Sequence, residues 1–242
     1  MAGTNTFSEI AGSPYGAGVT VEDGAAHVNV KRNTFTNGDW GVRIAQHPTM
    51  MSGTFVIDDN QFTNLHVTGV MLGLEVLVQS LQRNTFSGIT SSGSTPAVAL
   101  QLENDNPPFP YFAGIARARD NQFIGNDVAI QWVGNGSINA VAGVPPTDFG
   151  TSADPGHNVF RCNSTVASAQ AGFDLLVGVP SDGTAQLLFT GNYWDHIPPT
   201  TSTQSTAANG TDIVETSVTP QPVVITDGAM LATVPCPGGR TP

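Results

Sequence analysis

The feature that most constrains the fold is a triplet of asparagine, any residue and an aromatic residue, which recurs along the 242-residue chain. The triplets begin at Asn5, Asn33, Asn60, Asn84, Asn121, Asn158 and Asn192. Successive asparagines are 28, 27, 24, 37, 37 and 34 residues apart. Self-similarity at such intervals indicates a solenoid, in which each repeat is one coil that packs only on its neighbours.

Short alternating runs flank the triplets. They include residues 28–30, 55–57, 76–78 and 187–189 before the asparagine, and 18–21, 41–44, 69–72, 97–100, 128–130 and 174–177 after the aromatic residue. Alternation of apolar and polar residues indicates half-buried strands, and runs of about 3 to 5 residues suit stacked coils better than free-standing hairpins. Helix is disfavoured because 27 Gly and 17 Pro interrupt every candidate window. The chain is therefore predicted to be all-β, a parallel β-helix of about seven or eight coils.

Each residue type in the triplet has a physical role in such a coil. Asparagine tolerates the left-handed backbone of a sharp bend, and asparagines stacked one per coil can hydrogen-bond as a ladder. The aromatic residue two positions later is expected to face inward, so that the rings stack along the core.

Two intervals of 37 residues exceed the nearly bare 24-residue coil by about a dozen residues. The extra residues lie at 103–112 and 133–156, after the same strand of their coils, so both loops are expected to project from one edge. Phe109, Tyr111 and Trp132 are candidate binding residues there, although such rings equally pack loops onto a frame. We expect one domain over residues 1–242, with residues 200–242 as the C-terminal coil and capping tail.

The composition limits the classes of molecule that the chain is expected to bind. The formal charge is −11, from 19 acidic and 8 basic residues, which argues against nucleic acid or an anionic membrane as a partner. It permits calcium, although no cofactor is required, and the histidines lack the spacing of a metal site. The sequence contains no run of about 18 apolar residues, the length that a membrane-spanning helix needs.

The two cysteines, Cys162 and Cys236, leave two possibilities open: a disulfide that ties the tail to the body, or two free thiols. No signal peptide is visible after Met1. We nevertheless expect an extracellular or cell-surface location.

The coil pattern resembles the right-handed β-helices of the pectate-lyase-like superfamily over nearly the whole chain. The segment from Gly191 to Asp195 is similar to endings of carbohydrate-binding and sugar-hydrolase β-helix repeats, including periplasmic proteins of nitrous-oxide reductase maturation. The segments at 158–163 and 192–199 are similar to uncharacterised secreted β-helix domains of the myxobacterial type. The resemblance implies a right-handed coil. It also implies that any activity lies on the outer face of the sheet that follows the aromatic turn.

The outward positions expected on that sheet are Thr20, Arg43, Met71, Ala99, Gln101, Ala129, Gln131 and Leu176. A lyase needs clustered carboxylates for calcium and a basic residue to take a proton. Arg43 is the weak candidate for the base, and Glu103 and Asp105 are weak candidates for the acids. The acids available to this sheet, Glu22 and Asp23 included, lie about 10 to 14 Å apart along the axis, too far to share one ion. The neighbouring carboxylates Asp58 and Asp59 precede the asparagine bend, away from this face.

The sequence thus favours a non-catalytic module that recognises a polysaccharide or a surface protein, or that serves as a spacer. The candidate ligand-binding residues are Arg43, Gln101, Glu103, Phe109, Tyr111, Gln131 and Trp132. A polysaccharide lyase or glycoside hydrolase acting in a groove beside Arg43 and Gln101 remains an alternative. A third hypothesis is a solenoid that assembles into a homo-oligomer.

Overall fold

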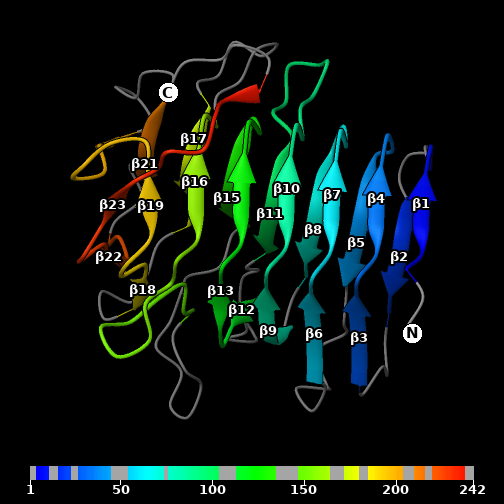
Figure 1. The fold of residues 1–242 in the computed structure, drawn as a ribbon, viewed down its shortest axis with the longest axis horizontal. Helices are drawn as coiled ribbons and strands as arrows, with labels where there is room; N and C mark the ends of the chain where they lie inside the picture. Colours follow the sequence, from blue (N-terminus) through cyan, green and yellow to red (C-terminus); the bar gives the residue numbers. More distant parts are fainter. Residues whose placement is uncertain are drawn as a thin grey trace.

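The computed structural model describes residues 4–10, 16–22, 27–44, 54–73, 76–103, 113–134, 147–163, 172–179, 185–203, 210–215 and 220–237. Within these ranges the regular secondary structure consists of 23 strands, with no α-helix. Figure 1 shows the strands stacked side by side along the longest axis, from β1 at one end to β22 and β23 at the other.

Three parallel sheets contain most of the strands. Sheet A consists, in order, of β1 (Thr6–Ser8), β4 (Thr34–Thr36), β7 (Gln61–Thr63), β10 (Thr85–Ser87), β14 (Gln122–Ile124), β16 (Val159–Arg161), β19 (Tyr193–Trp194) and β23 (Met230–Leu231). Sheet B consists of β2 (Ala17–Val21), β5 (Trp40–Ile44), β8 (Thr68–Leu72), β11 (Val98–Glu103), β15 (Val128–Val133), β17 (Phe173–Val177), β21 (Thr211–Glu215) and β20 (Thr201–Thr203). Sheet C consists of β12 (Gly114–Ile115), β9 (Leu77–Gln82), β6 (Thr54–Asp58) and β3 (His27–Lys31), with β13 (Ala118–Arg119) also on β9. The remaining strands, β18 (Gln186–Leu188) and β22 (Val223–Ile225), pair with each other.

Every strand pairing is parallel, and the coils that contain a sheet C strand run through sheet C, then sheet A, then sheet B. This arrangement confirms the predicted fold, a right-handed parallel β-helix. Sheets A and B contain eight strands each, which agrees with the expected number of coils. The assignment of residues 1–242 to one domain, with residues 200–242 as a cap, stays a prediction.

The aromatic residues of the triplets form one column inside the coils. Consecutive ring centroids from Phe7 to Phe160 lie 4.7–5.2 Å apart with nearly parallel planes, and Trp194 extends the column at 4.6 Å from Phe160. The spacing follows that of the strands, because every triplet occupies the same register of sheet A.

The asparagines of the triplets form the expected ladder. Along Asn60, Asn84, Asn121 and Asn158, the main-chain N–H and the side-chain Nδ2 each donate to Oδ1 of the next asparagine at 2.8–3.1 Å. Each of these Nδ2 atoms also donates to a main-chain carbonyl of its own or an earlier coil. The ladder therefore satisfies buried main-chain groups at the bend between sheets C and A.

The expectation that the ladder asparagines adopt the left-handed backbone is wrong. Positive φ occurs one residue earlier, at Arg32, Asp59, Arg83, Asp120, His157 and Gly191, with φ of 52–68°. A second set lies two residues after the aromatic residue, at Glu9, Asn37, Asn64, Gly88, Gly125 and Cys162. The physical reason is that the asparagine must send its side chain into the buried ladder. Its solvent-facing neighbour therefore takes the strained conformation.

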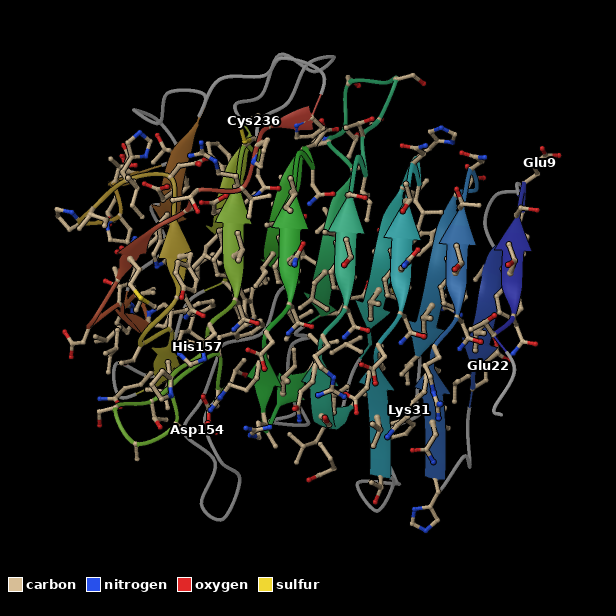
Figure 2. All side chains as sticks on the ribbon, viewed as in Figure 1. Glu9, Glu22, Lys31, Asp154, His157 and Cys236 are labelled. Atoms are coloured by element: carbon tan, nitrogen blue, oxygen red, sulfur yellow. A yellow bond between two sulfur atoms is a disulfide. The ribbon has the colours of Figure 1, made fainter. Side chains whose placement is uncertain are left out.

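The structure joins Cys162 and Cys236 in a disulfide, with their Cα atoms 5.7 Å apart. Arg161 adds a second tie to the same tail, because its Nε donates to the carbonyl of Val234 at 3.0 Å. In Figure 2, Cys236 lies on the opposite side of the solenoid from Lys31, Asp154 and His157, which follow the edge where sheet C ends.

Candidate functional site

The outer face of sheet B carries a row of residues in register across its strands. From β2 to β21 the row consists of Thr20, Arg43, Met71, Gln101, Gln131, Leu176 and Val214. Arg43, Gln101 and Gln131 are half-buried, so their stems pack on the sheet while their polar ends reach solvent. We call this row, together with Trp40, the sheet B strip.

Trp40 is a member of the strip that sequence reasoning missed. Its register partners are Thr68 on β8 and, through β8, Val98 on β11, and its own side chain is half-buried. Strict alternation counted from Arg43 would place Trp40 inside. The count fails because Gly41 and Val42 both point inward: a Cβ on Gly41 would lie 2.6 Å from the Phe62 ring, and Val42 belongs to the core.

The same irregularity corrects two predicted outward positions. Ala99 and Ala129 occupy the register of Gly41 in later coils, are fully buried and belong to the core cluster. Trp132 is also corrected as a binding residue. It is 1% exposed and packs edge to face on Phe189, with ring centroids 6.4 Å apart, so its ring is part of the core.

The candidate catalytic groups do not converge where the structure describes them. Arg43 Nη1 lies 3.7 Å from Glu22 Oε1, an ion pair whose carboxylate is largely exposed. Glu103 lies two strands away on β11, where its Oε1 accepts a hydrogen bond from Gln101 Nε2 at 3.3 Å. Asp105, Phe109 and Tyr111 lie outside the described residues, as do residues 104–112 of the first predicted loop and residues 135–146 of the second.

Part of the outer face of sheet B is buried, from β11 to β21. Five apolar side chains on it are at most 5% exposed and form a cluster separate from the main core: Val98, Val128, Phe173, Leu176 and Val214. The accessible members of the strip are therefore Thr20, Trp40, Arg43, Gln101 and Gln131, whereas Met71, between Arg43 and Gln101, is 6% exposed.

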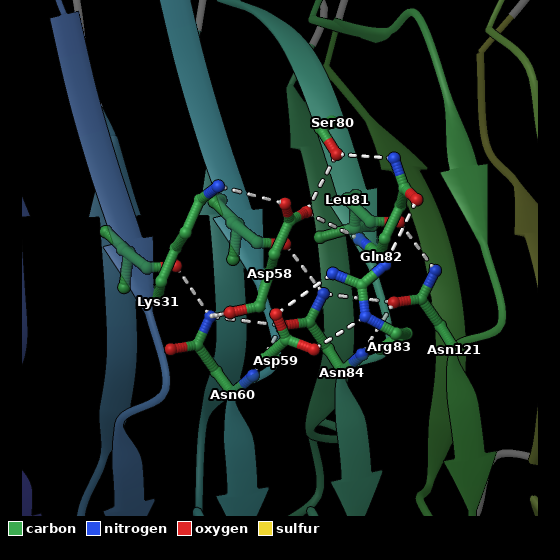
Figure 3. A network of polar contacts seen from close by, with 12 residues as sticks. Lys31, Asp58, Asp59, Asn60, Ser80, Leu81, Gln82, Arg83, Asn84 and Asn121 are labelled. Atoms are coloured by element: carbon green, nitrogen blue, oxygen red, sulfur yellow. Dashed lines mark hydrogen bonds and ion pairs between the residues drawn. The ribbon is translucent and has the colours of Figure 1, made fainter. Parts of the chain in front are cut away.

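Asp58, one of the two neighbouring carboxylates noted in the sequence, is committed to the scaffold (Figure 3). It is 6% exposed and accepts hydrogen bonds from Ser80 Oγ at 2.8 Å and from the main-chain N–H of Gln82 at 3.0 Å. Lys31 Nζ lies 3.4 Å from its other oxygen. These contacts fasten three strands of sheet C together.

Asp59 is committed as well. It accepts two hydrogen bonds from the Arg83 guanidinium, at 2.6 and 2.9 Å, and these bonds hold the pKa of Asp59 below its usual value. The left-handed positions alternate in charge from Arg32 through Asp59 and Arg83 to Asp120, and His157 Nδ1 lies 3.8 Å from Asp120. The bend before the asparagine is thus a charge-balanced edge of the solenoid.

No group of three or more His, Cys, Asp or Glu is placed to hold a metal ion in the described part of the chain. Nor does any helix among those residues have the length and apolar character needed to cross a membrane.

Stacked parallel coils, an asparagine ladder and a column of rings define a parallel β-helix. The chain belongs to the family described as protein of unknown function DUF1565, which matches residues 2–201. No curated protein and no solved structure matches it.

Proposed function

We propose that the chain is a non-catalytic recognition module that binds an extended polysaccharide along the sheet B strip. The observation that carries the proposal is the pair Gln101 and Gln131, which lie in register on adjacent strands with half-buried stems. Amide groups both donate and accept hydrogen bonds, as a chain of sugar hydroxyls requires. Trp40 adds an aromatic surface on the same face.

The proposal extends to setting and ancestry. The disulfide between Cys162 and Cys236 supports an extracellular or cell-surface location, because disulfides persist in oxidising compartments. The coil design supports membership of the pectate-lyase-like superfamily. The loops predicted after β11 and β15 would then stand beside the strip and contribute further contacts.

The direct test is affinity electrophoresis through gels that contain neutral or acidic polysaccharides, with and without calcium. We expect retardation by at least one of them, and about tenfold weaker binding in the double variant Gln101→Ala/Gln131→Ala, since two hydrogen bonds contribute about 0.5–1.5 kcal/mol each. The matched control is Gln61→Ala/Gln122→Ala, which removes two exposed glutamines from the outer face of sheet A. Equal loss of binding in both double variants would contradict the assignment to sheet B.

The alternatives make different predictions. A lyase or hydrolase would shorten the polysaccharide, and an Arg43→Ala or Glu103→Ala variant would abolish turnover; such a result would replace the recognition module with an enzyme. A surface protein as the ligand would leave every polysaccharide gel without effect. Self-assembly predicts a sedimentation coefficient that rises with protein concentration.

A further inference from the structure

Two buried aspartates lie side by side at the C-terminal end of the solenoid. Asp174 is on β17 and Asp212 is on β21, and the pairs Phe173 with Thr211 and Leu175 with Ile213 flank them in register. Their side chains are 2% and 1% exposed. Figure 1 shows β21 next to β17 near the C-terminal end.

The position is unusual for a carboxylate. In the preceding coils the same register row holds Gly18, Gly41, Gly69, Ala99 and Ala129. A Cβ on any of these three glycines would meet a phenylalanine ring of the central column, which shows that the row faces the interior. The last two coils therefore place carboxylates where earlier coils keep only small side chains.

The hydrogen bonds divide the two carboxylates into different roles. Asp212 Oδ2 accepts from the main-chain N–H and the hydroxyl of Thr200, both at 2.6 Å, and lies 2.9 Å from His196 Nδ1. Among the described residues, Asp174 Oδ1 accepts from Asn163 Nδ2 alone, at 2.7 Å. Asp212 thus has the environment of an ionised carboxylate.

The remaining oxygens, Asp174 Oδ2 and Asp212 Oδ1, are buried and receive no hydrogen bond from any other described group. Two ionised carboxylates side by side in a low-dielectric interior repel each other strongly, so one of them must be neutral. A proton on Asp174 would let Oδ2 donate to Asp212 Oδ1 and satisfy both atoms.

The charged groups around the pair favour this placement of the proton. Asp195 adds negative charge near Asp174, but its own oxygens accept from Arg161 Nη1 and from the main-chain N–H of Cys162, both at 2.7 Å. His196 faces Asp212 and not Asp174, and its ring is 42% exposed. Burial, followed by the charge of Asp212, raises the pKa of Asp174 well above its usual value.

We propose that Asp174 is protonated in the folded protein and donates a hydrogen bond to ionised Asp212, so that a bound proton holds β21 against β17 and closes the C-terminal end of the solenoid. The device is independent of the binding function proposed for the sheet B strip.

The direction of the pH effect follows from the raised pKa of Asp174. Below the pKa of an unfolded aspartic acid the contribution of the pair to stability is fully present. It is lost as the pH rises through the pKa of folded Asp174, where the second negative charge forms inside the core. The solenoid end is therefore expected to be closed at acidic pH and weakened at alkaline pH.

The test combines unfolding with infrared spectroscopy on the full chain. We expect the urea midpoint of the wild type to fall as the pH is raised from acidic to alkaline values, and the Asp174→Asn variant to lose at least about half of that fall, because its amide donates to Asp212 without titrating. The control is Asp127→Asn, another fully buried aspartate, whose Oδ2 accepts from the N–H groups of Ser91 and Ala97. This variant should keep the wild-type dependence on pH.

Infrared spectra keep the proposal falsifiable even if Asp174→Asn fails to fold. The wild type at neutral pH should show the carbonyl band of a protonated carboxylic acid, and Asp127→Asn should retain it. Absence of this band in the wild type would overturn the proposal. So would a rise of the alkaline midpoint on adding calcium or sodium at constant ionic strength, because a cation would then occupy the place assigned to the proton.

Discussion

Removal of one ladder asparagine measures how much the ladder contributes to stability, and Asn121 is the best position for it. Its side chain makes four hydrogen bonds. Oδ1 accepts from the main-chain N–H and Nδ2 of Asn84, both at 3.0 Å, and Nδ2 donates to the Leu81 carbonyl and to Asn158 Oδ1, both at 2.8 Å. In Asn121→Ala the buried N–H of Asn84 loses its acceptor.

An orphaned buried N–H costs about 1–3 kcal/mol, and the other lost bonds add about 0.5–1.5 kcal/mol each. Allowing for partial relaxation, we expect Asn121→Ala to lower the free energy of unfolding by about 3–5 kcal/mol. The natural control is Asn5→Ala at the exposed end of the same ladder, where Nδ2 donates to Asn33 Oδ1 at 3.0 Å. There the expected loss is about 0–1 kcal/mol.

The two variants are compared by urea unfolding followed by circular dichroism, with the same dependence of the free energy of unfolding on urea concentration assumed for both. If their free energies of unfolding differ by less than about 1 kcal/mol, the ladder satisfies polar groups without holding the coils together, and the reasoning fails.

Three further variants test other parts of the scaffold. Replacing both Cys162 and Cys236 by serine should lower the free energy of unfolding by up to about 4.5 kcal/mol, the chain-entropy value for a sequence separation of 74. Reductant should lower the wild-type urea midpoint to that of this variant and leave the midpoint of the variant unchanged. Gly41→Ala should cost about 1–3 kcal/mol in thermal unfolding, because its Cβ would lie 2.5 Å from a main-chain oxygen. Gly93→Ala should stay within about 0.5 kcal/mol, because its Cβ would make only an ordinary contact, with Ser91 Oγ at 3.5 Å. Arg83→Gln should remove about 0–1 kcal/mol of stability that salt screens; the wild type gains this contribution above the pKa of an unfolded aspartic acid and loses it as the pH falls through the lowered pKa of folded Asp59. Equal salt and acid dependence in both proteins would contradict that role.

The sequence was sufficient for the fold because the triplet occupies the same place in every coil. Asn84 and Asn121 are 37 residues apart and still bond directly, while Asn60 and Asn84 do so across 24 residues. Insertions between coils therefore leave the register unchanged. A second, shorter ladder from Asn126 to Asn163 was missed, because only two coils contain it and neither asparagine is followed by an aromatic residue two positions later.

The candidate site was harder to predict because alternation fails within sheet B. Two consecutive residues point inward at Gly41 and Val42, so counting outward positions by strict alternation missed Trp40 and wrongly placed Ala99 and Ala129 outside. Trp132 was misplaced for another reason: it adjoins a predicted loop, although its register places it in the core. Asp174 escaped notice because an acid at the start of a strand looks like a turn residue until the neighbouring coil is known.

The separation of scaffold and surface explains why the sheet B strip is the natural place for a binding function. Coils are held together by the ladder, the aromatic column and the ion pairs at the bends, and each of these lies at the bends or inside the coil. Gln101 and Gln131 belong to none of them, so their substitution should alter binding while leaving the unfolding midpoint nearly unchanged. A solenoid transmits stability only between neighbouring coils, which leaves such outward positions free to change with the ligand.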